Sequence, residues 1–446
     1  MPDTPDLPPA LKSKIFEDAA NFAGHVFEEE ADFVGATFQA TADFSGATFQ
    51  KFANFSGATF QKGANFADAV FSLEASFLVA TFKDSAIFEH AKFRAGVQFA
   101  EASFTKRATF TGASFRGRTG FRRAEFTDSV DFDRARFDVF VPRNPVVVAN
   151  FEAAHFRGKA SFSGTSFAGK IIFSGVHFAA EAIFDRARFD TLAQFKGATF
   201  SQITHFYDAR FGLVADFEGA TFEGHLAFNR ARFVGVASFI NAEMKSRTSF
   251  NRAVFRERPP DLAGAKLHEG TTWFGVKLPP APATIDAAED TVGYYERLKL
   301  EMDRLKKHED ELNFFTLELQ ARRVLGGKWS SLTGWAIGAY GLLSDYGRSI
   351  LRPLAGLGVV IGLGAPAFWA HDAWPAWRDW PAWRAALGLS AANTLGVFNF
   401  RQAFFTADEI AKLPGWLQVL SAGETILGAL LLFLLGLGLR NTFRLR

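Results

Sequence analysis

Ala53-Asn54-Phe55-Ser56-Gly57-Ala58-Thr59-Phe60-Gln61-Lys62-Gly63 is one unit of a repeat that fills the first half of the chain. Within the unit, an alanine stands two places before each phenylalanine. The two phenylalanines recur every eleven residues, in one series over 22–132 and a second over 27–137. Both series resume after an interruption, over 151–250 and 156–255, with Met244 as the only replacement. A repeat this short and regular indicates a solenoid.

The spacing within a unit decides between extended and helical structure. Residues two apart lie on the same face only in an extended chain, so each alanine and its phenylalanine point to one side. Glycine, threonine, serine and aspartate fill the other positions, and these residues disfavour helices. Steps that alternate between five and six residues fit four-sided coils of about 22 residues, each rising about 4.8 Å. We therefore predict an all-β parallel coil in which identical rings stack on one another.

The segments Ala31-Asp32-Phe33, Ala42-Asp43-Phe44, Ala53-Asn54-Phe55 and Ala64-Asn65-Phe66 resemble the pentapeptide-repeat family. Units of that family read Ala-(Asp/Asn)-(Leu/Phe)-X-X. The resemblance extends over about residues 16–273 and implies a right-handed quadrilateral parallel β-helix, which we expect over 16–277. Alternate units carry one extra residue, as in the Phe-rich branch of the family, so the geometry of the corners stays open.

Some members of the family mimic DNA and bind topoisomerases, which requires a markedly acidic surface. Residues 16–258 contain 27 acidic and 28 basic side chains, so the surface lacks that charge. The whole chain of 446 residues has a formal charge of +2, which does not favour a nucleic-acid partner either.

Chemistry-bearing residues are sparse. The absence of cysteine excludes a disulfide scaffold, thiolate metal ligands and a cysteine nucleophile, and nine scattered histidines leave little for a zinc centre. No local signature of a catalytic triad or of a phosphate-binding loop is present. We therefore expect no enzyme, cofactor or metal site.

An insert at 138–150 interrupts the repeat, because the step from Phe137 to Phe151 is fourteen residues long. It contains Pro142, Arg143, Asn144 and Pro145 and must leave the coil as a lateral loop. The loop is either a contact for a protein partner or a plain insertion, which a solenoid surface tolerates.

Beyond the repeat, residues 278–347 begin with a proline-rich linker and continue with a helical pattern. One stripe at helical spacing contains Val292, Tyr295, Leu298, Met302 and Leu305, and a second contains Leu312, Phe315 and Leu319. These amphipathic helices could pair with each other, cap the solenoid or assemble subunits.

Residues 348–446 contain two apolar runs, 350–370 and 416–439, each long enough to cross about 30 Å of hydrocarbon. They predict a two-span membrane domain in contact with membrane lipid. The tail at 1–15 is polar and has no apolar core, so we expect no cleaved signal peptide. Basic residues flank the outer ends of the pair and place both termini and the β-helix in the cytoplasm, although basic residues between the spans weaken this bias. The flanking residues are Lys328, Arg348, Arg440, Arg444 and Arg446. We expect a multi-pass protein of a bacterial inner membrane.

The segment at 385–400, between the spans, is either re-entrant or periplasmic. Its few polar residues suit a helix that dips into the bilayer. Thr394-Leu395-Gly396-Val397-Phe398 resembles the Thr-Val-Gly-Tyr-Gly filter of two-helix ion channels, with Phe398 in place of the second glycine. This pore-like segment would require several subunits around it.

Glu424 is the strongest candidate for a functional residue inside a span. A carboxylate in hydrocarbon is costly and commonly faces a partner or a water-filled cavity. Alternatively, it lies near enough to Trp416 to reach the interface, or it is protonated and bonded to Ser421 or Thr425. A set of small residues in the first span suits close helix packing; it comprises Gly356, Gly358, Gly362 and Gly364.

Together these features predict a membrane-anchored, homo-oligomeric scaffold that presents a rigid cytosolic β-helix to an unknown protein partner. The alternative is an oligomeric two-span ion channel in which the β-helix is a regulatory domain. The two readings differ in whether the spans enclose a water path.

Overall fold

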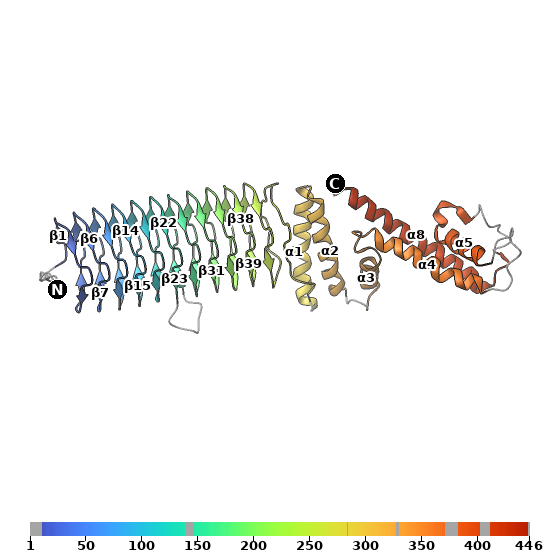
Figure 1. Ribbon diagram of the computed structural model, residues 1–446, viewed down its shortest axis with the longest axis horizontal. Helices are drawn as coiled ribbons and strands as arrows, with labels where there is room; N and C mark the ends of the chain where they lie inside the picture. Colours follow the sequence, from blue (N-terminus) through green and yellow to red (C-terminus); the bar gives the residue numbers. More distant parts are fainter. Residues whose placement is uncertain are drawn as a thin grey trace. The chain divides into compact units, whose positions relative to one another are not determined.

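The phenylalanine repeat folds as a four-sided parallel β-solenoid (Figure 1). The structure is a computed structural model, and it describes residues 11–138, 147–282, 284–326, 330–370, 382–401 and 411–444. The chain divides into two compact units, 1–280 and 281–446. Each unit is described by itself.

Four parallel sheets form the sides of the solenoid, three with 11 strands and one with 10. Most strands have two residues, and each pairs with the strand that lies four places later in the chain. The sheets begin with β1 (Ile15–Phe16), β2 (Ala20–Asn21), β3 (Val26–Phe27) and β4 (Ala31–Asp32). They end with β41 (Glu243–Met244), β42 (Thr248–Ser249), β43 (Val254–Phe255) and β40 (Val236–Ser238). The predicted four-sided coil is confirmed.

The register places each phenylalanine over the one 22 residues earlier, as in β5 (Thr37–Phe38) and β9 (Thr59–Phe60), where Phe38 pairs with Phe60. Their rings stack with centroids 4.8 Å apart and an interplanar angle of 0°. Rings from opposite sides, half a coil apart, meet edge to face, as Phe44 and Phe55 do at 5.4 Å. Most of these rings are fully buried, and burial of each contributes roughly 1.5–3 kcal/mol.

The corners alternate in the same way as the spacing of the repeat. A five-residue step turns through a residue with positive φ, such as Gly46 at 64° or Gly57 at 65°. An Asx turn supports this corner, because the Oδ1 atoms of Asp43 and Asn54 accept bonds from backbone N–H groups two residues later, at 2.9 and 3.2 Å. An Asp or Asn directly before the first phenylalanine of a unit is therefore a turn residue. The six-residue steps form the other corners as bends.

The insert does not interrupt the core. Phe137 stacks on Phe115 at 4.5 Å and on Phe167 at 4.9 Å, across the insertion point. The chain rejoins the solenoid in β24 (Val147–Asn150), which pairs with β20 (Thr119–Gly120). The candidate partner residues Pro142 to Pro145 lie outside the residues that the structure describes.

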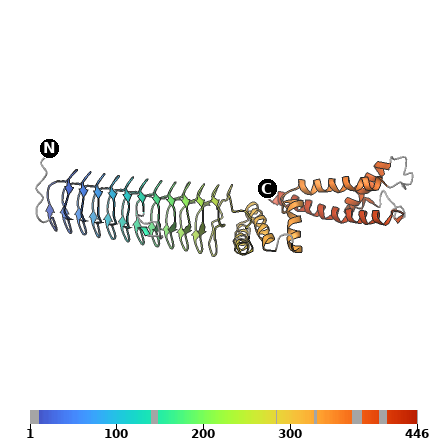
Figure 2. The same cartoon turned by 90° about the horizontal axis from the view of Figure 1, so that it is seen from below.

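The second unit is helical. It contains α1 (Ile285–Arg304), α2 (His308–Leu325), α3 (Leu332–Ser344), α4 (Leu351–Trp369), α5 (Ala382–Thr394), the 3₁₀ turn η1 (Gly396–Phe398) and α8 (Gly415–Arg444). Helices α1 and α2 pack together as a hairpin, and α4, α5 and α8 pack together as a group. Both views show α4 and α8 side by side (Figures 1 and 2).

The sequence predicts the buried face of α1 correctly and that of α2 wrongly. Four of the five stripe residues on α1 are buried: Val292, Tyr295, Leu298 and Met302. On α2, the buried residues are Phe314, Thr316, Glu318, Ala321 and Val324, whereas Leu312, Phe315 and Leu319 are only half-buried. The buried Glu318 carboxylate is neutralised by Lys299 on α1, with Nζ to Oε2 at 2.6 Å, and by Arg322. The buried face of α2 therefore includes a charged residue, Glu318, and for this reason the pattern of apolar residues did not predict it.

Helices α4 and α8 have the length and the apolar composition needed to cross a membrane. Only 22% of the most apolar window of α4 and 28% of that of α8 is buried. Large apolar side chains point outward, among them Leu351 at 75% exposed, Leu363 at 74% and Val419 at 72%.

Candidate functional site

Glu424 lies on α8 in the interior of the helical unit, where it is 3% exposed. Two donors on α5 bind its carboxylate: Ser390 Oγ donates to Oε1 at 2.5 Å, and Asn393 Nδ2 donates to Oε2 at 2.9 Å. The two donors are three residues apart and so project from the same face of α5. The hydrogen bonds of Glu424 therefore come from α5, and not from Ser421 or Thr425 on its own helix.

Helix α4 closes the third side of this site. Ser390 Oγ also lies 3.2 Å from the backbone oxygen of Ile361 on α4. A Cβ added to Gly364 would lie 2.8 Å from both Glu424 Cδ and Ser390 Oγ, closer than real Cβ atoms come. The absence of a side chain at Gly364 is thus what admits the carboxylate.

Two of the four glycines of α4 serve helix packing. Gly364 faces the carboxylate, and a Cβ on Gly356 would meet Leu431 of α8 at 3.0 Å. Gly358 and Gly362 have no atom of the described chain within 4 Å of such a Cβ. The prediction that these small residues allow close packing is therefore correct for Gly356 and Gly364 and wrong, within the part of the chain that the structure covers, for Gly358 and Gly362.

Further polar atoms are buried at this level without a partner in the described chain: Asn393 Oδ1, Thr394 Oγ1 and Ser421 Oγ. Ser390, Asn393 and Thr394 are each 0% exposed, and Ser421 is 2% exposed. Thr425 turns back on its own helix, where its Oγ1 donates to the backbone oxygen of Ser421 at 2.9 Å. Helices α5 and α8 therefore hold a polar cluster inside an otherwise apolar group, with Glu424 as its only ionisable member among the residues described.

The pore-like segment ends α5 and forms η1. Thr394 is the last residue of α5, and a Cβ on Gly428 of α8 would lie 2.7 Å from its carbonyl carbon. The backbone oxygens of Leu395 and Gly396 accept bonds from Phe398 and Asn399, both at 3.0 Å. These two carbonyls serve a tight turn within one chain. The side chains of Val397 and Phe398 are 65% and 59% exposed.

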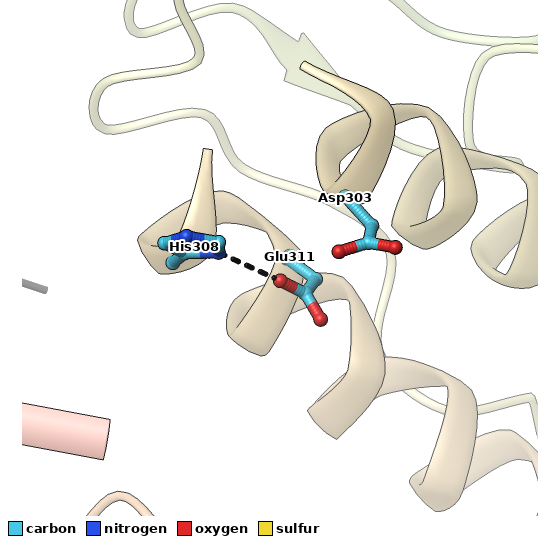
Figure 3. A group of neighbouring side chains, drawn as sticks. All are labelled: Asp303, His308 and Glu311. Atoms are coloured by element: carbon cyan, nitrogen blue, oxygen red, sulfur yellow. Dashed lines mark hydrogen bonds and ion pairs between the residues drawn. The ribbon is translucent and has the colours of Figure 1, made fainter. Parts of the chain in front are cut away.

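A second group of polar side chains lies where the α1–α2 hairpin meets the end of α8. Asp303, His308 and Glu311 bring their ligand atoms within 4.8 Å of one another, and His308 Nδ1 lies 3.1 Å from Glu311 Oε2 (Figure 3). A carboxylate and imidazole set of this kind suits a divalent metal. Arg444 of α8 already provides a positive charge, because its Nη2 lies 3.8 Å from Asp303 Oδ1 and 3.6 Å from Glu311 Oε2. The group therefore acts as an ion-pair junction between the hairpin and α8.

A cavity of about 400 Å³ opens beside this junction, between α1, α2, α3 and α8. Its basic lining residues are Lys299, Arg440 and Arg444, and Tyr340 and Leu437 also line it. Burial raises the pKa of Tyr340, while the positive charge of Arg440 opposes that rise. Leu312 and Phe315 of the mispredicted stripe face this cavity. In the sequence, Arg440 and Arg444 indicate only the orientation of the spans in the membrane. No local sequence pattern predicts that these residues of α8 lie close to α2.

The comparison with known proteins concerns the solenoid. A sequence profile described as pentapeptide repeats (nine copies) matches residues 15–59, 55–103, 148–188 and 184–232. The solenoid belongs to the pentapeptide-repeat family. No curated protein and no solved structure matches the chain.

The pentapeptide-repeat domain carries an arginine column on one side. Arg188 pairs in register with Arg210, which pairs with Arg232, so the three side chains follow one another along one sheet. All three are exposed. Arg188 lies 3.5 Å from Asp190, whereas Arg210 and Arg232 form no ion pair with the described residues, although the charge of Arg232 helps to lower the pKa of Asp208. We call these three residues the arginine column.

A neighbouring pair shows how the surface charges of the pentapeptide-repeat domain are arranged. Arg230 Nη2 lies 2.7 Å from Asp208 Oδ2, and the hydrogen bond from Arg230 lowers the pKa of Asp208. By contrast, burial raises the pKa of Asp185 one coil earlier, although the backbone N–H of Tyr207 donates to its Oδ1 at 2.9 Å. Asp185 and Asp208 beside the column are thus each held by a local hydrogen bond.

Proposed function

We propose that the protein is a membrane-anchored scaffold that presents its pentapeptide-repeat domain to another protein, and that it is not an enzyme. Phenylalanine and alanine fill the interior of this domain, so recognition has to take place on its outer columns. A preformed surface of this kind binds a partner with little ordering cost.

The exposed apolar faces of α4 and α8 carry the anchoring part of the proposal. The core helix of a soluble protein buries most of its large apolar side chains, whereas α4 and α8 turn many of theirs outward, among them Leu351, Leu363 and Val419, and the residues that they bury include glycines and Glu424. A lipid environment satisfies both features.

Extraction of cell membranes with alkaline carbonate tests this proposal. We expect the full chain to stay in the membrane pellet, and a variant that ends before α4 to be released. Release of the full chain would refute the anchor.

We propose an inner-membrane location in a bacterium, with both termini and the β-helix in the cytoplasm. Arg348, Arg440 and Arg444 near the outer ends of the spans support this orientation. Fluorescent-protein and alkaline-phosphatase fusions to the C-terminus test it, since each reporter is active on one side only. Phosphatase activity at the C-terminus would contradict the orientation.

For the docking part, we propose that the arginine column binds an acidic surface of the partner. A row of like charges, two of which form no ion pair with the described residues, is a feature that an acidic partner neutralises. Cross-linking in membranes should lose its protein adducts in the double variant Arg210→Glu and Arg232→Glu. The control is Arg157→Glu, which changes an exposed arginine on another sheet. Equal adduct loss in both variants would refute the role of the column.

The second candidate function is an oligomeric ion channel, and the position of α5 favours it. Ser390 of α5 contacts Ile361, which lies ten residues into α4 and therefore about 15 Å along its axis. If α4 spans the bilayer, α5 enters about half-way and returns, as a re-entrant helix does. Its C-terminal end brings the polar cluster of Glu424 to that depth.

Ion flux into liposomes separates the two candidates. If the protein is a channel, the wild type should give ion flux, and the rate should change in Glu424→Gln. Gly436→Ala is the control and should leave the rate unchanged, because a Cβ at this position has no atom of the described chain within 4 Å. No flux above empty liposomes would leave the scaffold as the better proposal. Native mass spectrometry of the same preparation measures whether the chain is homo-oligomeric.

A further inference from the structure

Three basic residues, Lys299, Arg440 and Arg444, line the cavity between α1, α2, α3 and α8. Lys299 and Arg444 each have carboxylate partners, since Lys299 binds Glu318 and Arg444 bridges Asp303 and Glu311. Arg440 lines the cavity without an ion pair to any residue that the structure describes. Among the three basic residues of the lining, Arg440 is therefore the one whose charge is available to bind an anion.

Donors other than Arg440 also converge on the cavity. Tyr340 lies on α3, and its ring is held edge to face against Tyr346, with centroids 5.8 Å apart. Asn441 follows Arg440 on α8 and donates through Nδ2 to the backbone oxygen of Gly347 at 3.0 Å. This bond ties the end of α8 to the turn after α3, so the lining groups from the two helices are fixed relative to each other.

The lining of the cavity also includes apolar side chains. Leu312 and Phe315 contribute from α2, and Leu437 contributes from α8. On α8, the change from apolar to basic residues falls between Leu437 and Arg440, one turn apart. The cavity therefore lies at the level where an apolar span ends and its basic flank begins, which is where lipid phosphates lie.

We propose that this cavity binds a phosphate-bearing anion, namely the headgroup of an anionic phospholipid, with Arg440 as its principal charged contact. The headgroup part rests on the proposed membrane anchoring of α8. Arginine suits this ligand because its planar guanidinium donates two parallel bonds to phosphate oxygens. Leu437 and Phe315 would contact the apolar part of the same lipid.

Binding at this place would link the membrane to the hairpin. The cavity shares His308, Glu311 and Arg444 with the ion-pair junction. A bound phosphate would compete with Glu311 for Arg444 and so change how firmly α8 holds the α1–α2 hairpin.

The test compares full-length protein in nanodiscs of phosphatidylcholine alone and of phosphatidylcholine mixed with phosphatidylglycerol. Native mass spectrometry counts the phosphatidylglycerol that each chain retains. The variants are Arg440→Gln and, as matched control, Arg348→Gln, which removes the same charge from an exposed residue outside the cavity lining. We expect Arg440→Gln to bind phosphatidylglycerol about tenfold more weakly than the wild type, and Arg348→Gln to match the wild type.

The outcomes separate this inference from the proposed function. A chain that enters nanodiscs but shows equal retention in wild type and Arg440→Gln overturns the inference alone. A chain that does not enter nanodiscs overturns the membrane anchor and the headgroup assignment together. A parallel titration with inorganic phosphate in neutral detergent separates the two sources of phosphate. Thermal stabilisation by inorganic phosphate that Arg440→Gln abolishes, without any lipid preference, would keep the phosphate site and overturn the headgroup as its source.

Discussion

Replacement of Gly428 by alanine should open the contact between α5 and α8. A Cβ at this position would lie 2.7 Å from the carbonyl carbon and 2.9 Å from Cα of Thr394, whereas ordinary contacts begin at 3.4 Å. The obstructing atoms belong to the backbone, so no side chain can rotate away. The carbonyl oxygen of Thr394 would lie closer still than its carbonyl carbon, so α5 has to move out by more than about 0.7 Å. The same displacement weakens the bond from Asn393 to Glu424.

The expected cost combines these two effects. Overpacking costs roughly 1–3 kcal/mol, and a buried carboxylate that loses a donor costs roughly 1–3 kcal/mol more. A total of about 3 kcal/mol would raise the open fraction of α5 about a hundredfold. Gly436→Ala is the matched control, because it makes the same change in helix propensity on the same helix with no described neighbour within 4 Å.

Thiol labelling measures this opening. The chain has no cysteine, so a single cysteine at Ala392, which is 4% exposed in the cluster between α4, α5 and α8, reports only on that cluster. When opening and closing are fast, the labelling rate follows the open fraction. A labelling rate in Gly428→Ala that equals the rate in Gly436→Ala would refute the close contact.

Three further predictions concern the two units separately. Phe110→Ala removes a ring stacked between two others and should lower the free energy of unfolding by about 3–5 kcal/mol in denaturant titrations. Phe274→Ala, at a side chain that is 71% exposed, should change it by less than about 0.5 kcal/mol, and equal losses would contradict the stacked core. Because Arg230 lowers the pKa of Asp208 below its usual 3.8, their pair stabilises the fold above pH 3.8 and ceases to do so as the pH falls through the lowered value. The difference in Tm between wild type and Asp208→Asn should therefore be small and shrink on acidification; a constant difference would argue against the pair. Arg444→Gln removes the ion pairs to Asp303 and Glu311 and should speed hydrogen exchange where α1 meets α2, whereas unchanged exchange would mean that the junction does not hold the hairpin.

The solenoid could be predicted almost completely because every coil repeats the same local choice. The pairing of Phe38 with Phe60 needs only the period of the sequence, and where a unit has Asp or Asn before its first phenylalanine, as at Asp43, that residue forms a turn with the next two residues. The geometry of the corners needed the structure, because the spacing of the repeat does not specify the backbone conformation of the five-residue and six-residue steps.

The helical unit was harder to predict because its contacts are distant in the chain. Glu424 was identified from its charge in an apolar run, but its donors Ser390 and Asn393 come from another helix with no shared period. The prediction that Leu312, Phe315 and Leu319 form the buried face of α2 was wrong for a related reason. Its buried face contains Glu318, which is tolerated only because Lys299 lies opposite.

The passage of the ring stack past the 138–150 insert has a consequence for how such a chain changes length. Phe137 keeps both of its stacked neighbours although eight more residues than usual separate it from Phe151. Contacts therefore reach only the adjacent coil, and gene duplication or deletion of one whole coil would leave every other coil with the same neighbours. The number of coils and the length of the corner loops can therefore change independently in evolution. The same independence would allow peptides to be grafted into the corner loops of the solenoid.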